Sequence, residues 1–142
     1  MQKRTKKICS VLLAAVLLFG CFTGVMLAYA EDANEIIPID DAHFPDANWQ
    51  EVVRAEYDTD GEPGLSAAER NVVTMQIPAL VEKHLGKDAQ ITSLEGIEYF
   101  TNLQKLRCAD LGLTALDVSK LEKLEELTCE GNELTDLNIK NN

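Results

Sequence analysis

The stretch LQKLRCADLGLTALDVSKLEK, residues 103–123, is followed directly by LEELTCEGNELTDLNIKNN, residues 124–142. The two stretches align without a gap at an offset of 21 residues. The aligned pairs that keep their apolar or threonine character are Leu103/Leu124, Leu106/Leu127, Cys108/Cys129, Leu113/Leu134, Thr114/Thr135, Leu116/Leu137 and Val118/Ile139. So many matches in one register indicate a repeated structural unit and exclude a chance resemblance.

The spacing within each unit identifies the kind of repeat. An L-x-x-L-x-[L/C]-x-x-N-x-L frame with a period of about 20–29 residues is the signature of the leucine-rich repeat. Each such unit buries its apolar face against its neighbours and adds one short strand to a parallel sheet. The sequence therefore predicts an α/β solenoid of leucine-rich repeats over residues 72–142, with an incomplete last coil.

Strand alternation assigns the side chains of these repeats to two faces. Leucines and the two cysteines point inward, and the residues between them point outward. Both cysteines are interpreted as small buried apolar residues, although a disulfide between neighbouring coils stays open in an exported protein. The outward residues form a candidate binding surface on the concave sheet face, made of Lys105, Arg107, Glu126, Thr128 and Glu130.

A third copy of the frame lies upstream of the two repeats. Val72, Met75 and Ile77 fit its apolar positions, with polar residues between them, and so predict a first strand that pairs with the strand after Leu103. The longer separation comes from an insert at residues 78–86, predicted to be a short helix. One continuous helix over residues 66–85 is the alternative, which Pro78 disfavours. The apolar residues that follow every third position, from Ile91 onward, predict a convex return made of turns or 3₁₀ structure.

Residues 31–71 are predicted to be a lead-in and a helical cap. Asp46 can accept hydrogen bonds from free backbone N–H groups at the start of a helix. Trp49, Val52, Val53 and Tyr57 follow at helical spacing and give that helix one apolar stripe. The acidic segment before it, residues 31–41, is predicted to form a short strand or an extended arm.

Residues 58–69 resemble a twelve-residue EF-hand loop. Carboxylates at suitable positions make this loop a candidate calcium site, with Asp58, Asp60, Glu62 and Glu69 as ligands. Pro63 departs from the pattern, because it stands where the glycine of such a loop belongs. The alternative is purely structural: Ser66 and Glu69 form a capping box that starts a helix through about residue 71. A helix–loop–helix shape is expected in either case.

Residues 1–30 are predicted to be a secretory signal peptide. A basic start precedes an almost unbroken apolar run over residues 8–27, and Ala28-Tyr29-Ala30 forms a cleavage site. Two alternatives stay open. The run is long enough for an uncleaved membrane anchor, and residues 18–21 faintly resemble a lipoprotein box, which the bulky Phe19 disfavours. Cleavage after Ala30 predicts a secreted or cell-surface protein.

The remaining chain is strongly acidic. The leader holds four of the 13 basic residues and none of the 24 acidic ones, so the rest carries a net charge of −15. Such a surface repels the phosphates of nucleic acids and anionic lipids, which disfavours both as partners of the mature chain. Its main consequence is solubility.

Several phrases together resemble the capped N-terminus of internalin-type bacterial leucine-rich repeat proteins. These are Phe44-Pro45-Asp46-Ala47-Asn48, the EF-hand-like turn, and the run from Ile91 to Leu103. The later coils, with Leu116-Asp117-Val118-Ser119, are similar to a shorter repeat variant of secreted proteins from gut-dwelling Gram-positive bacteria. The resemblance implies a helical cap, a curved solenoid, and protein recognition on the concave face. In internalins the equivalent cap turn holds no calcium, whereas residues 58–69 keep more carboxylates there.

These features favour an exported protein that recognises or adheres to another protein. The chain contains no nucleophile–histidine–acid set and no glycine-rich phosphate loop, so no enzymatic activity is predicted. The alternative is a calcium-stabilised capping module that presents a further C-terminal domain, which could be an enzyme. Few strand starts and an uncapped last coil lead us to expect a longer protein.

Overall fold

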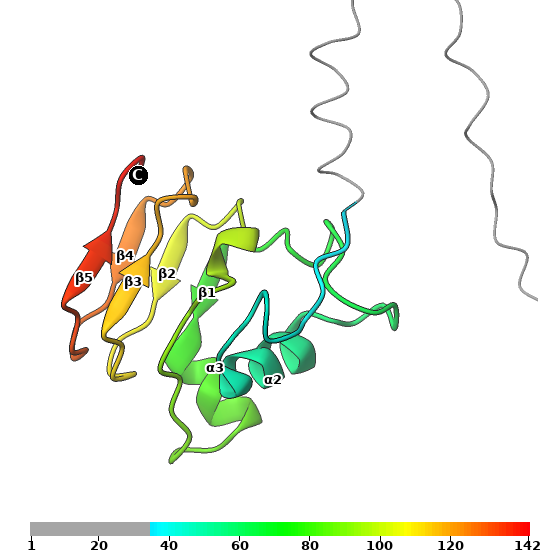
Figure 1. Ribbon diagram of the computed structural model, residues 1–142, viewed down its shortest axis with the longest axis horizontal. Coiled ribbons are helices and arrows are strands. Elements are labelled where there is room, and N and C mark those ends of the chain that lie inside the picture. The colour runs from blue at the N-terminus through cyan, green and yellow to red at the C-terminus, as the bar shows by residue number, and fades with distance from the viewer. Residues whose placement is uncertain (1–34) are drawn as a thin grey trace, which may run out of the picture.

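The computed structural model describes residues 35–142, so the predicted signal peptide lies outside the described part. The helices are α2 (Ala47–Glu56), α3 (Ile77–His84) and the 3₁₀ turn η1 (Ile97–Tyr99). The strands are β1 (Thr74–Gln76), β2 (Lys105–Arg107), β3 (Ala115–Asp117), β4 (Glu126–Thr128) and β5 (Asp136–Asn138). Figure 1 shows the strands stacked side by side, with α2 and α3 at the β1 side of the stack. Within residues 35–142, no helix has the length and apolar character needed to cross a membrane.

Helix α2 begins where the sequence predicts it. Asp46 caps it by accepting a hydrogen bond of 2.9 Å from the Trp49 N–H. Trp49, Val52 and Val53 are fully buried, because they form the one apolar stripe of the helix. At its other end, Glu56 accepts hydrogen bonds from Lys83 and His84 of α3, at 2.6 and 2.7 Å, and so joins the two helices.

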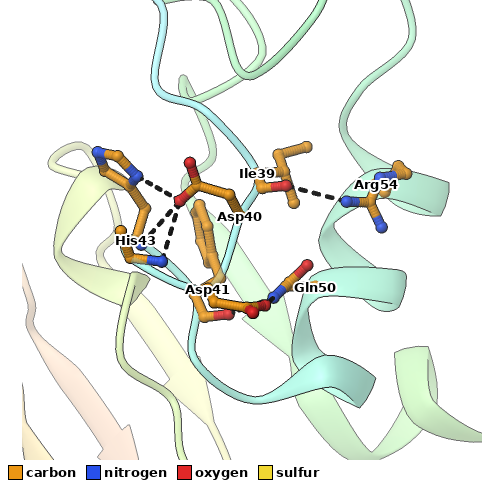
Figure 2. Close-up of polar contacts among 8 residues, drawn as sticks. Ile39, Asp40, Asp41, His43, Gln50 and Arg54 are labelled. Atoms are coloured by element: carbon orange, nitrogen blue, oxygen red, sulfur yellow. Dashed lines mark hydrogen bonds and ion pairs between the residues drawn. The ribbon is translucent and has the colours of Figure 1, made fainter.

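The lead-in runs beside α2 and is tied to it by polar contacts (Figure 2). Gln50 of α2 donates to the Asp41 carboxylate at 2.7 Å, and Arg54 donates to the Ile39 carbonyl at 2.9 Å. Within the lead-in, the Asp40 carboxylate contacts the His43 ring at 2.6 Å. These contacts fix the lead-in, which places Ile37 beside Leu65 of the loop 58–69.

Ile37 forms an isolated antiparallel bridge with Leu65, through backbone hydrogen bonds of 3.0 and 2.8 Å. The predicted short strand is therefore a single bridged residue. Gly64 stands beside it with a φ of 93°, and a Cβ there would lie 2.5 Å from the Ile37 carbonyl oxygen. Only glycine allows both this left-handed conformation and this close approach.

The predicted helix from Ser66 to about residue 71 is wrong. Residues 67–70 form a turn, closed by a hydrogen bond of 3.1 Å from the Arg70 N–H to the Ser66 carbonyl. The chain must already be extended at Thr74 to pair with β2, and β-branched Val72 and Val73 favour that extension. The expected helix–loop–helix shape is consequently absent from this part of the described chain.

Strands β1, β2 and β4 form one parallel sheet in that order. Leu106 of β2 pairs with Leu127 of β4, at the 21-residue offset of the repeats. Met75 of β1 pairs with Leu106 on the other edge of β2, which confirms the third copy of the frame. The insert between them forms α3, followed by Gly86 in the left-handed conformation with a φ of 91°.

The return of each repeat is a strand, and the predicted convex return of turns or 3₁₀ structure is therefore wrong there. Leu116 of β3 pairs with Leu137 of β5 in a second parallel sheet, again at an offset of 21 residues. The prediction holds in the coil before the repeats, residues 72–102, where η1 occupies the return. Because the two repeats have the same spacing, their return segments lie side by side in register. Hydrogen bonding between these segments then makes both of them strands.

Asn132 joins the two repeats from inside. Its side chain accepts from the N–H groups of Leu111 and Leu113, both at 3.1 Å, and donates to the Cys108 carbonyl at 2.7 Å. It also donates to the Cys129 carbonyl of its own repeat at 2.9 Å. Both cysteines are free thiols. Cys108 is buried, as predicted, whereas Cys129 is only half-buried.

Candidate functional site

The predicted binding residues lie on the outward face of the sheet β1–β2–β4. Lys105 and Arg107 are exposed at the two ends of β2, on either side of buried Leu106. Glu126 and Thr128 stand opposite them on β4. Glu130 is exposed but lies in the turn after β4, so it borders this face and does not belong to a strand.

Two of these residues neutralise each other. The Lys105 ammonium donates to the Glu126 carboxylate at 2.8 Å across the ladder. This hydrogen bond lowers the pKa of the Glu126 carboxyl and raises the pKa of the Lys105 ammonium. Arg107 stands opposite an uncharged residue, Thr128, and so presents its charge to solvent.

Sequence reasoning missed two residues of this face, Thr74 and Gln76. Both are exposed on β1, where Thr74 pairs with Lys105 and Gln76 with Arg107. The face thus carries two rows of three side chains, in the order of the strands. The signal was present in the third copy of the frame, whose polar positions align with Lys105 and Arg107 at an offset of 31 residues.

The acidic loop brings together three of its four predicted ligands. Ligand atoms of Asp58, Asp60 and Glu69 lie within 4.8 Å of one another. Glu62 does not belong to this group; its N–H donates to the Asp60 carboxylate at 2.8 Å. The cluster offers carboxylate oxygens, which Ca²⁺ prefers, from fewer side chains than the sequence predicts.

Glu69 closes this loop by hydrogen bonds. One carboxylate oxygen accepts from the N–H groups of Thr59 and Asp60 at 2.6 and 3.1 Å. The other accepts from the Ser66 N–H at 3.0 Å and the Ser66 hydroxyl at 2.9 Å. The Glu69 N–H in turn donates to the Ser66 hydroxyl at 3.4 Å, so the reciprocal contacts of a capping box are present.

These contacts set the ionisation of Glu69. Burial by itself raises the pKa of its carboxyl, but the hydrogen bonds from Ser66, Thr59 and Asp60 outweigh burial, so the pKa lies below its ordinary value. The charged carboxylate therefore holds both ends of the loop together. A cation at this cluster would have to share oxygens that already accept hydrogen bonds.

The pairing of parallel strands at the repeat period defines the chain as leucine-rich-repeat-like. It is similar to an internalin from Listeria monocytogenes, with 24% sequence identity and a TM-score of 0.48. The similarity covers 72% of this chain and 32% of the internalin chain, so the chain spans about a third of that protein's length. No model of a protein family and no curated protein sequence matches the chain. The fold assignment consequently depends on the strand pairing of the chain itself.

Proposed function

We propose that this chain is a protein-recognition module whose partner binds the outward face of the sheet β1–β2–β4. One observation carries the proposal: three parallel strands in register hold two rows of polar and charged side chains, all of them exposed except the half-buried Thr128. Because the strands are fixed by a buried core, these side chains are preorganised for binding. Arg107, with its charge turned to solvent, is the main anchor we expect.

In this proposal, residues 35–71 cap the stack at the β1 side. Phe44 and Trp49 are fully buried and extend the core of the strands under the helical segment. Asp46 links this segment to the coil before the repeats, residues 72–102 (the long coil), since its carboxylate accepts from the Thr92 N–H at 2.7 Å. A cap of this kind shields the end of an apolar stack from water. We further propose that residues 1–30 direct the protein to the cell surface or the medium.

The test is reversal of four charges on this face. Lys105→Glu, Arg107→Glu, Glu126→Lys and Glu130→Lys together leave the net charge of the chain unchanged. A displayed library of extracellular protein domains supplies the binders, and biolayer interferometry measures them against the full chain. We expect the reversal to abolish binding of the enriched domains, because complementary charges set the register of an interface.

A matched control separates this face from surface charge in general. Glu82 of α3 and Lys87, which follows the helix, are exposed and lie outside the sheet face, with the Lys87 ammonium 3.7 Å from the Glu82 carboxylate. The double reversal Glu82→Lys and Lys87→Glu should leave binding intact. If the four-charge variant binds the same domains as strongly as the original chain, the proposed face is not the binding surface.

We propose as a second candidate that the loop 58–69 takes Ca²⁺ and stabilises the cap. It is favoured by the convergence of Asp58, Asp60 and Glu69. Millimolar Ca²⁺ should then raise the melting temperature relative to a chelator, since a ligand that binds only the folded chain stabilises it. Asp60→Asn should remove the rise, and Glu62→Gln, outside the cluster, should keep it. An identical melting temperature with Ca²⁺ and with chelator would show that hydrogen bonds alone close the loop.

A further inference from the structure

A hollow opens on the sheet β3–β5, which is separate from the proposed binding face. Its volume is about 750 Å³, within the range of about 300–1,000 Å³ that ligand pockets occupy. Residues 92–95 and 98 form one wall, and the other wall consists of residues 114–117, 120 and 136–138. The second wall contains the whole of strand β3 and of strand β5. The hollow therefore lies beside a sheet and not between helices.

The edge of β3 that faces this hollow is open. Strand β2 has a neighbour on each edge, whereas β3 pairs only with β5 among residues 35–142. The Val118 N–H donates to the Asn138 carbonyl at 2.9 Å, and the Thr114 carbonyl accepts from the Thr135 N–H at 2.8 Å. The backbone N–H and C=O groups of the even-numbered residues thus point toward β5.

Successive residues of a strand direct their backbone groups to opposite edges, so the backbone groups of the odd-numbered residues point to the open edge of β3. Ala115 and Asp117 consequently turn their N–H and C=O groups toward the first wall. In β2 the equivalent position is occupied: the Lys105 N–H donates to the Val73 carbonyl of the long coil at 3.1 Å. The slot beside β3 is the place where a third strand of this sheet would lie.

Among residues 35–142 no segment fills the slot, because of the path of the chain one repeat period upstream. Residues 94–96 precede Ala115–Asp117 by 21 residues, yet they form no strand. Gly96 has a φ of 97°, which turns the chain into η1, and a Cβ there would lie 2.2 Å from the Phe44 ring. The wall is fixed in this position, because the Asp46 carboxylate also accepts from the Thr92 hydroxyl at 2.9 Å. The slot is therefore preformed.

The hollow is acidic. Four acidic residues line it, Glu95, Glu98, Asp117 and Asp136, against one basic residue, Lys120. Their excess negative charge attracts cationic groups and repels anionic ones.

We propose that this hollow binds an extended, lysine- or arginine-bearing segment of a partner protein, which adds a strand to the open edge of β3. Backbone hydrogen bonds to Ala115 and Asp117 supply affinity, and the acidic side chains select basic residues at alternate positions of the segment. This mode of binding differs from recognition by the side chains of the sheet β1–β2–β4, and it does not depend on it.

The probe is a fluorescent seven-residue peptide of alternating lysine and valine, titrated with the full chain and followed by fluorescence polarisation. Glu95→Lys combined with Asp136→Lys should weaken its binding at least about tenfold, because the rim loses its attraction for lysine. Glu122→Lys combined with Glu133→Lys is the control, since it makes the same charge change at exposed residues that do not line the hollow. An equal loss of binding in both variants would overturn the proposal.

A second peptide tests the added strand. Methylation of alternate backbone nitrogens removes the N–H donors of one peptide edge but keeps every charge, and we expect a further loss of about tenfold or more. If this peptide binds as well as the parent, charge alone explains the binding and no strand is added. Reversal of Lys105, Arg107, Glu126 and Glu130 should leave peptide binding unchanged, so this test and that of the sheet face fail independently.

Discussion

The two repeats share one apolar pattern but bury it to different degrees. Leu116 of the first repeat, residues 103–123, is 4% exposed, whereas the aligned Leu137 of the second repeat, residues 124–142, is 43% exposed. Val118 is fully buried, and the aligned Ile139 is 55% exposed. The paired side chains are of the same apolar type and hold the same position in the repeat. The repeat pattern therefore cannot account for the difference in their exposure.

Stacking accounts for it. The first repeat lies between the long coil and the second repeat, with β2 paired on both edges. The second repeat has a strand neighbour on one side within the described residues. A repeat pattern thus determines which side chains point inward, while the neighbouring coils determine how completely water is removed from them. Substitutions at aligned pairs and at contacts between the repeats therefore measure this difference.

The largest difference is expected for the aligned leucines. Leu116→Ala should lower the free energy of unfolding by about 2–5 kcal/mol, because it leaves a cavity in a closed core. Leu137→Ala should cost less than about 1 kcal/mol, since much of that side chain is already in water. Urea unfolding of the full chain measures both costs. Equal costs would mean that Leu137 is covered in solution, for example by a second copy of the chain.

A smaller effect is expected at the polar link between the repeats. Asn132→Ala should cost about 2–3 kcal/mol, because it leaves the Leu111 and Leu113 N–H groups and the Cys108 carbonyl without their partner. Asn132→Asp should cost less, since a carboxylate still accepts from both N–H groups but cannot donate to the carbonyl.

The control for Asn132 is Asn138, the neighbouring asparagine of β5. Its side chain donates to the exposed Asp117 carboxylate at 3.0 Å and accepts from the Lys140 N–H at 3.2 Å. Both contacts are exposed to solvent, so Asn138→Ala should change the unfolding free energy by less than about 0.5 kcal/mol. The same urea titration compares all three variants. A cost at Asn132 no larger than at Asn138 would contradict the role of Asn132 in joining the repeats.

The sheet β1–β2–β4 could be predicted because its signal is local to each repeat. Parallel pairing in register places residues of one type at one height, and the Leu106/Leu127 pair shows this directly. Met75 could be found in spite of the insert, since it keeps the spacing to its own apolar neighbours. The N-cap at Asp46 was equally accessible, because a cap and an apolar stripe are features of one segment.

The strands β3 and β5 could not be predicted in the same way. Ala115, Asp117, Asp136 and Asn138 have low strand propensity, and only the pairing between repeats makes them strands. The turn at residues 67–70 was missed for a related reason: the capping box forms, but the demand for an extended chain at Thr74 prevents a helix from following it. The hollow depends on packing between Gly96 and Phe44, which are 52 residues apart, and no short pattern encodes such a contact.

The aligned cysteines, Cys108 and Cys129, should differ in reactivity because the two repeats bury them to different degrees. Burial raises the pKa of the Cys108 thiol to about 12, with a further contribution from Cys129, so almost none of it is thiolate at pH 8. Cys129 is half-buried and more accessible to a reagent. Because the thiolate is the reactive form, iodoacetamide at pH 8 should alkylate Cys129 at least about tenfold faster than Cys108.

Mass spectrometry of proteolytic peptides after timed alkylation measures the two thiols separately, and denaturation in urea before alkylation is the control that should equalise them. Leu137→Ala should raise the rate at Cys108 little, since the first repeat keeps its neighbours, whereas Leu116→Ala should raise it by loosening the core around that thiol. Equal rates at Cys108 and Cys129 in the folded chain would mean that the repeats open together, and that stacking protects the first no better than the second.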